Sequence, residues 1–376
     1  MAYTNIDDPS AYFQALTYTG NGSHPRNLTN DGNSDLKPDL VWLKNRTDSG
    51  TNHVLANSSI GWDAPKGQGY PWENGPFGGQ MASNSTGAES TPSATYGYVS
   101  AALTDGFTTA AGGTNGDVAN ANAKEYVAWQ WKANGGTTAS NTDGTITSTV
   151  QANTDAGFSI YTYTGTGAAG TVGHGLGGLP EMIILKGRNT TSDWPVYIDP
   201  QKDGSLQFPK LNGTEANIGN SPFTWDTTKF TFSSGSGYSN TSGTNYIAYA
   251  FRSIQGYSKI GSYVGNGSAN GAFVYTGFKP AFIMIKDTSQ ATNWEMFDHK
   301  RNPSNVANLK LGANLNAAEN GSDLGNTSQN NIDMLSNGFK MRTGNTDTNV
   351  SGDTYIYMAF AENPLVTSTG VPTTAR

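Results

Sequence analysis

Two carboxylates beside a tryptophan come closest to a catalytic pattern in this chain. Glu295 and Asp298 follow Trp294, and glycoside hydrolysis uses two carboxylates that face each other across a cleft. Spacing along the sequence does not place both groups on one cleft. A related segment, Trp194-Pro195-Val196-Tyr197-Ile198-Asp199, keeps the tryptophan and an aspartate but has no counterpart of Glu295. We therefore predict that the tryptophan packs in a strand and that the chain has no catalytic residue.

Residues that bind metals or cofactors are scattered along the chain. The four histidines, His24, His53, His174 and His299, stand one by one, and neither an HExxH nor a GxSxG motif occurs. The absence of cysteine excludes disulfides, thiolate metal sites and a cysteine nucleophile. The stretch Asn345–Asp353 is rich in Asp and Asn, which suits either calcium binding or turn formation. We predict no cofactor and no metal site, with calcium left open.

Three lysines recur in one sequence context. Lys44, Lys186 and Lys286 each end a hydrophobic run. A ligand site present in triplicate would explain the recurrence. A lysine at the end of a buried strand can also extend its ammonium group to water while its stem covers apolar surface. We predict this second role, because lysines are rarely fully buried.

The lysines end three similar stretches, which are Pro38–Lys44, Pro180–Lys186 and Pro280–Lys286. Each begins with a proline, which suits the first residue of a strand, and continues as a short apolar run typical of a strand buried on both faces. Similar segments flank each stretch. They are Thr17–Gly22, Thr162–Gly167 and Ser262–Gly267 upstream, and Tyr126–Trp131, Tyr246–Phe251 and Tyr355–Phe360 downstream. We interpret the chain as a threefold internal repeat.

The predicted fold is all-β, with three consecutive β-sandwich (jelly-roll-like) modules. We place the modules at residues 1–134, 157–254 and 255–365, with a linker or short hairpin at 135–156 and a flexible tail at 366–376. The 15 Phe, 18 Tyr and 8 Trp supply the buried area of such cores, and 47 glycines supply tight turns. Modules two and three have almost no linker between them, so we expect a rigid pair and more freedom between modules one and two.

The first module contains a long insertion without a counterpart in the other two. It carries Trp62, Tyr70, Trp72 and Phe77 among glycines and prolines. Such rings are costly to leave in water, so the loop either covers the core of its own module or contacts something else. We name these four residues as a candidate interface or glycan contact. A lid, a docking surface for another subunit and a sugar-stacking surface are the three alternatives.

Charge and hydropathy exclude several classes of partner. The net charge is −7, and 22 basic residues stand scattered among 29 acidic ones, which argues against a nucleic-acid groove. The longest apolar runs are far shorter than the roughly 18 residues that span a bilayer. The opening residues also lack the basic and apolar regions of a signal peptide. We therefore expect neither nucleic-acid binding, nor membrane insertion, nor export by a cleaved leader.

Four segments carry a resemblance to a known group of proteins. Ile6–Gln14, Asn30–Lys44, Gly173–Leu176 and Tyr355–Pro364 resemble repeat-containing virion structural proteins, often labelled tail fibres, of marine tailed bacteriophages, including cyanophages. The resemblance covers most of the chain and brings no catalytic residue with it. It implies a protein assembled in the host cytoplasm and resident in the virion.

The resemblance also implies partners. They are other proteins of the tail or capsid, a glycan of the host surface, and further copies of the chain in a homotrimer. The first module is then expected to dock on the virion while the third points outward. The alternative function is a carbohydrate-active enzyme, a depolymerase acting on host surface polysaccharide.

Overall fold

The computed structural model describes residues 3–62, 79–89, 96–113, 117–199, 208–216, 223–232, 237–324, 332–344 and 347–373. Within these ranges the chain forms 24 strands and two single-turn 3-10 helices, η1 (Pro9–Ala11) and η2 (Ser322–Leu324). Every ladder between these strands is antiparallel. The prediction of an all-β fold is confirmed.

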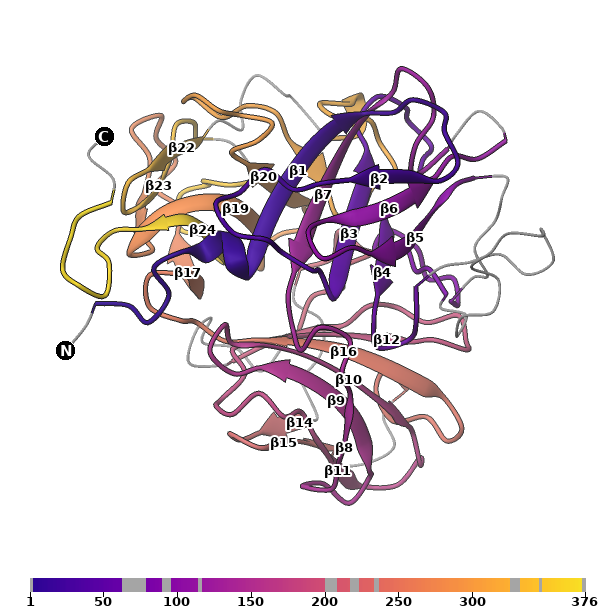
Figure 1. Cartoon of the computed structure of the whole chain (residues 1–376). Coiled ribbons are helices and arrows are strands. Elements are labelled where there is room, and N and C mark those ends of the chain that lie inside the picture. The colour runs from indigo at the N-terminus through magenta and orange to yellow at the C-terminus, as the bar shows by residue number, and fades with distance from the viewer. Residues whose placement is uncertain are drawn as a thin grey trace.

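The strands form six sheets, which we group into three units of one larger and one smaller sheet (Figure 1). The sheets of unit 1 are β1 (Phe13–Thr19), β7 (Glu125–Trp131), β3 (Leu40–Asn45) and β4 (Val54–Asn57), and β2 (Arg26–Leu28), β6 (Phe107–Ala110) and β5 (Tyr98–Ala102). Those of unit 2 are β13 (Val196–Ile198), β12 (Met182–Gly187), β16 (Asn245–Phe251), β10 (Phe158–Thr164), β9 (Ser148–Asn153) and β8 (Ala139–Asn141), and β11 (Gly170–Gly173), β15 (Lys229–Phe232) and β14 (Phe223–Trp225). Those of unit 3 are β17 (Ser258–Val264), β24 (Thr354–Pro364), β19 (Phe278–Asp287), β20 (Trp294–Asp298) and β21 (Leu311–Gly312), and β18 (Phe273–Tyr275), β23 (Gly338–Met341) and β22 (Ile332–Leu335).

The proline-led stretches occupy the same place in the three larger sheets. They form β3, β12 and β19, and each lies beside the strand that closes its unit, β7, β16 or β24. Each closing strand also pairs with the tyrosine-bearing strand upstream. A stacked tyrosine pair marks this second pairing, with ring centroids 5.0 Å apart for Tyr18 and Tyr126, 5.1 Å for Tyr163 and Tyr246, and 5.0 Å for Tyr263 and Tyr355.

The two faces of each proline-led strand enter different cores. Successive side chains of a strand point to opposite faces. On β3, Leu40 and Trp42 belong to one large cluster shared by all three units, whereas Val41 and Leu43 pack in a cluster confined to unit 1. We call these the central core and the local core. The alternation on β12 and β19 is the same, with Met182, Ile184, Phe282 and Met284 in the central core and Ile183, Leu185, Ile283 and Ile285 in local cores.

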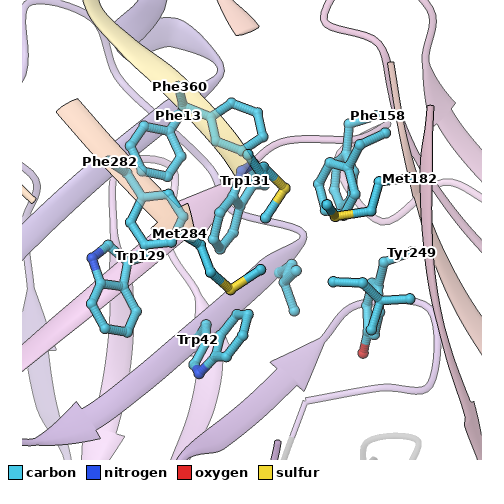
Figure 2. Close-up of a cluster of buried hydrophobic side chains, with 14 of the residues drawn as sticks. Phe13, Trp42, Trp129, Trp131, Phe158, Met182, Tyr249, Phe282, Met284 and Phe360 are labelled. Carbon is cyan, nitrogen blue, oxygen red and sulfur yellow. The ribbon is translucent and has the colours of Figure 1, made fainter. Parts of the chain in front are cut away.

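Trp131 lies where the three units meet (Figure 2). Its ring centroid is 5.1 Å from that of Phe13 in unit 1, 6.4 Å from Phe251 in unit 2, and 5.9 Å and 5.6 Å from Phe282 and Phe360 in unit 3. Rings at such separations and tilted angles attract each other beyond the area they bury. The three larger sheets are thus packed against one another as well as against their own smaller sheets.

The connection between units 1 and 2 is a hairpin, one of the two predicted alternatives. The stretch predicted as a linker or hairpin forms the hairpin β8–β9, which extends the larger sheet of unit 2. Gln151 on β9 donates to Ser58 Oγ at 2.8 Å in unit 1. The central core and contacts of this kind replace the freedom that we expected between the first two modules.

The tail predicted to be flexible makes contact with the rest of the chain in its described part, up to residue 373. The Ser368 backbone N–H donates to Asp7 Oδ1 at 2.6 Å, which fastens the tail to the beginning of the chain.

Replacing Trp131 by alanine tests the shared core. We expect the Trp131→Ala variant to lose about 3–5 kcal/mol of unfolding free energy, because a large ring common to three units leaves a cavity. Urea unfolding followed by circular dichroism and by fluorescence measures the loss, and both probes should report one coincident transition in the wild type. The control is Trp225→Ala, a half-buried ring packed only on the local core of unit 2. Separate transitions in the wild type would contradict one common core.

Candidate functional site

The three strand-end lysines do not reach water, contrary to prediction. Lys44, Lys186 and Lys286 each have 0% exposure. They lie on the same side of their strands as the central-core residues, two positions beyond Trp42, Ile184 and Met284. The predicted exposure is wrong because that side of the strand faces the central core between the units rather than solvent.

Hydrogen bonds to carbonyl groups replace water around these ammonium groups. Lys186 Nζ donates to Thr86 O of unit 1 at 2.9 Å, and Lys286 Nζ donates to Thr214 O of unit 2 at 3.1 Å. The partners of Lys44 are Asn45 O at 2.7 Å and Thr51 Oγ1 at 3.1 Å, both in unit 1. Two of the three lysines therefore fasten one unit to the loop of the preceding unit.

Burial lowers the pKa of all three lysines. The pKa falls from 10.5 to about 7 for Lys44, and to about 8 for both Lys186 and Lys286. The principal cause is loss of hydration of the charged form, and the nearby Asp48 opposes it at Lys44. These amines are unusual in titrating near neutral pH while fully enclosed.

An arginine two residues after the lysine makes the strongest contacts between units. Arg188 of unit 2 donates from Nε to Glu89 Oε2 of unit 1 at 2.5 Å. Arg46 of unit 1 donates to both carboxylate oxygens of Glu319 of unit 3, at 2.9 Å and 2.7 Å. Paired donors matched to a carboxylate give geometrically specific bonds. We call these two contacts clasps. Unit 3 has Thr288 at the corresponding position and lacks the arginine.

The clasp between units 3 and 1 continues into a buried charge network. Arg301 is fully buried, and its Nη1 donates to Glu319 Oε1 at 3.0 Å. Its Nε donates to Asp298 Oδ2 at 2.5 Å, and Asp298 also accepts from Trp129 Nε1 of unit 1 at 3.1 Å. Glu319 therefore lies between two guanidinium groups, and Asp298 is held by partners from both units.

The clasp residues Arg46, Glu319, Arg188 and Glu89 were not among the predicted site residues. A faint signal existed, because Lys-x-Arg occurs in two of the three stretches and each clasp glutamate follows an asparagine by five residues. Those asparagines bind a backbone N–H, from His53 to Asn84 Oδ1 at 2.9 Å and from Trp294 to Asn314 Oδ1 at 3.0 Å. The arginine and the glutamate of each clasp come from different units, so a sequence pattern within one unit does not show that they pair.

Glu295 and Asp298 do not share a cleft. Both have 0% exposure on β20, and they stand three positions apart, so they point to opposite faces of the strand. Asp298 is held at the contact with unit 1, whereas Glu295 lies 3.4 Å from Lys310 Nζ within unit 3. Trp294 packs in the central core, as predicted for a strand residue. This geometry does not fit the paired carboxylates of a glycosidase.

Of the four aromatic residues named in the insertion, Trp62 alone lies within the described part of the chain. Trp62 is half-buried and packs against the local core of unit 1. Tyr70, Trp72 and Phe77 lie outside the described residues. The lid alternative therefore gains a contact at Trp62, while the interface and glycan alternatives remain predictions.

His53 and the described part of the Asn/Asp-rich stretch serve packing and turns. His53 is fully buried with Nε2 2.9 Å from Gly312 O, and burial lowers its pKa well below the usual value. Asn349 donates to Ser268 O at 2.9 Å and to Thr343 O at 2.8 Å, which ties two turns together. No group of three or more His, Asp or Glu residues within the described ranges is placed to hold a metal ion.

Two adjoining hollows open on unit 3, and the smaller of them is also lined by residues of unit 1. Their volumes are about 290 Å³ and about 760 Å³, and four residues line both of them, namely His299, Lys300, Glu362 and Asn363. Lys300 pairs with Asp31 of unit 1 at 2.7 Å. The lining offers donors and acceptors at an open surface, which suits a polar ligand. These hollows are the candidate ligand site of the described surface.

Removing one carboxylate tests the clasp network. Glu319→Ala leaves the buried Arg301 facing Arg46 without the shared carboxylate, and we expect a loss of about 3–5 kcal/mol in unfolding free energy. The matched control is Glu89→Ala, which leaves one partly exposed arginine unpaired and should cost about 1 kcal/mol or less. Denaturant unfolding of both variants measures the difference. Equal losses would contradict a special role for the network between units 3 and 1.

The lowered pKa of Lys44 predicts a pH dependence of stability. Between the folded pKa of about 7 and the unfolded value of 10.5, the unfolded state binds more protons, so the contribution of Lys44 to stability rises with pH. Lys44→Met should remove this rise. The difference in unfolding free energy between wild type and variant should then change by up to about 1.4 kcal/mol per pH unit across that window. Denaturant titrations at several pH values measure it, and parallel curves would contradict the buried amine.

The comparisons with known proteins place the chain in one family. No curated protein and no solved structure matches it. No helix in the described part of the chain is long and apolar enough to cross a membrane. A family model matches residues 8–364, which takes in all three units. The chain belongs to the family described as Domain of unknown function (DUF7483).

Proposed function

We propose that this protein is a non-enzymatic structural component of a phage virion, a tail-fibre-like or capsid-attached appendage that contacts glycan on the host surface. Support for virion residence comes from the sequence resemblance of four segments, Ile6–Gln14, Asn30–Lys44, Gly173–Leu176 and Tyr355–Pro364. The expected partners are other virion proteins and further copies of the chain in a homotrimer. The first unit is the proposed docking end.

The observation that carries the non-enzymatic part is the placement of charged residues. Arg301 binds Asp298 and Glu319 within unit 3, and these two carboxylates bind Trp129 and Arg46 of unit 1. Asp298, one of the two candidate carboxylates, is thus committed to the contact between units 3 and 1. A depolymerase is the less supported alternative, because its two candidate carboxylates lie on opposite faces of β20.

The glycan part of the proposal rests on the two hollows lined by His299, Lys300, Glu362 and Asn363. Sugars present many hydroxyl groups, which pair with carboxylate, amide and imidazole groups of this kind. The smaller hollow lies between units 1 and 3, and a boundary between two structural units is a common location of ligand sites. Trp62 and the rest of the aromatic insertion remain a second candidate contact.

Purified virions test the location. Labelled antibody raised against the protein should bind the tail or the capsid of intact particles. Presence of the protein in infected cells together with its absence from purified particles would overturn virion residence. Incubation with host lipopolysaccharide and exopolysaccharide should release no oligosaccharide, whereas release that Glu295→Gln abolishes would establish the depolymerase alternative.

A double variant tests the ligand site. His299→Ala with Asn363→Ala should weaken binding to host-surface polysaccharide at least about tenfold, because several hydrogen bonds are lost together. The thermal midpoint should change little. Lys340→Ala, at an exposed pair with Asn270 in the smaller sheet of unit 3, is the control. Unchanged binding by the double variant would rule out the hollows as the glycan site.

A further inference from the structure

A lysine and two acids are enclosed together in unit 3. Lys310 Nζ is 3.4 Å from Glu295 Oε1 and 3.7 Å from Asp347 Oδ2. The side chains of Lys310 and Glu295 have 0% exposure, and that of Asp347 has 14%. Lys310 Nζ also donates to Leu324 O at 2.5 Å. We call Glu295, Lys310 and Asp347 the triad.

The other two units show that the fold does not need charged residues at these places. Glu295 pairs with Gly312 in unit 3, and Pro195 pairs with Lys210 at the same place in unit 2, so Glu295 corresponds to Pro195. Lys310 and Phe208 each stand two residues before these partners, so they also correspond to each other. The equivalent tyrosines Tyr263 and Tyr163 donate to Thr348 O and Ser239 O. Asp347 and Tyr238 directly precede these acceptors, so they correspond to each other. Unit 1 has Val54, Gln80 and Val118 at these positions by the same pairings.

Unit 2 fills the space with apolar contacts. The rings of Phe208 and Tyr238 meet edge to face, with centroids 5.6 Å apart. Well-packed apolar groups usually replace a buried ion pair without loss of stability, because burying charges requires removing their water. Unit 3 therefore carries charged residues where its sheets alone call for none. Such an arrangement is expected where the charges perform chemistry.

Glu295 has the environment of a proton carrier. Its Oε2 is buried and has no hydrogen-bond partner among the described residues, while Oε1 faces the lysine amine. Burial raises its pKa from 4.5 to about 8, so the carboxyl group is mainly protonated at neutral pH. A neutral carboxyl beside an amine and a second carboxylate can donate one proton and accept another.

We propose that the side chains of Lys310 and Asp347 condense into an intramolecular amide bond, with Glu295 moving the protons. A proton first passes from the ammonium group to the carboxylate, which gives a neutral amine and a carboxylic acid. The lone pair of Nζ then attacks Cγ of Asp347. Glu295 takes a proton from the nitrogen and delivers one to the departing oxygen. The C–O bond breaks, one water molecule leaves, and Glu295 regains its starting state.

The enclosure supplies what this condensation needs. The ammonium and carboxylate are held at 3.7 Å in one fixed arrangement, which replaces an encounter in solution. No oxidant, metal or external reactant takes part. The bond would close a chain segment that contains β22 and β23, in a protein that has no cysteine for a disulfide.

Mass spectrometry of the full-length wild-type protein under denaturing conditions is the direct test. We expect a mass lower than that of the sequence by one water molecule. Proteolysis should release a branched peptide joining the segment around Lys310 to that around Asp347. A wild-type protein that keeps its full mass after prolonged incubation, and yields only linear peptides, would overturn the proposal.

Variants separate the roles of the triad. Lys310→Met and Asp347→Ala should keep the full mass expected for their sequences, and Glu295→Gln should condense at least about a hundredfold more slowly, as loss of a general acid–base group predicts. Asp347→Asn should still condense, now losing ammonia instead of water. Circular dichroism confirms that each variant is folded. Unimpaired condensation in Glu295→Gln would overturn the role of Glu295.

The pair Lys210 and Asp193 provides a matched control within the same molecule. Its atoms are closer, at 2.9 Å, but the side chains are 17% and 21% exposed. We expect no branched peptide at this pair. Cross-linking there to the same extent would contradict the requirement for enclosure and for Glu295.

Discussion

Packing of three sheets against one another around Trp131 is the constraint on which this structure depends. Each larger sheet has its smaller sheet on one side and the other two larger sheets on the other. Its proline-led strand therefore has no face left for water, which explains why β3, β12 and β19 are buried at nearly every position. The units cannot be separated without exposing Trp42, Met182 and Phe282 together.

The packing of the three sheets buries polar groups where one unit meets the next, and the three contacts differ in the charged residues that they use. Units 1 and 2 share the Arg188–Glu89 clasp, and units 3 and 1 share Arg46, Glu319 and Arg301. Units 2 and 3 rely on Lys286 bound to Thr214 O and on Trp294 Nε1 bound to Lys210 O at 2.8 Å. Unit 1 is the first and unit 3 the last along the chain. The contact between them holds the largest charge network among the three contacts in the described part of the chain.

The local pairing of strands could be predicted from the sequence, whereas the packing of units could not. A proline followed by an apolar run predicted β3, β12 and β19, and the positions of Tyr18, Tyr163 and Tyr263 followed from the same comparison. An apolar run predicts that both faces are covered but not what covers them. The burial of Lys44 and the clasp partners of Arg46 and Arg188 depend on residues from another unit, so neither was recognised.

Comparing the three units with one another distinguishes structural requirements from particular tasks. A feature present in all three, such as the stacked tyrosine pair, is explained by the shared arrangement of strands. Glu295 and Lys310 differ in this respect, because unit 2 has Pro195 and Phe208 in their places and remains fully packed there. A buried charge that the arrangement does not require lowers stability unless it is compensated. An amide bond between Lys310 and Asp347 would remove both charges and add a covalent tie, which gives the triad a physical reason to persist in a core.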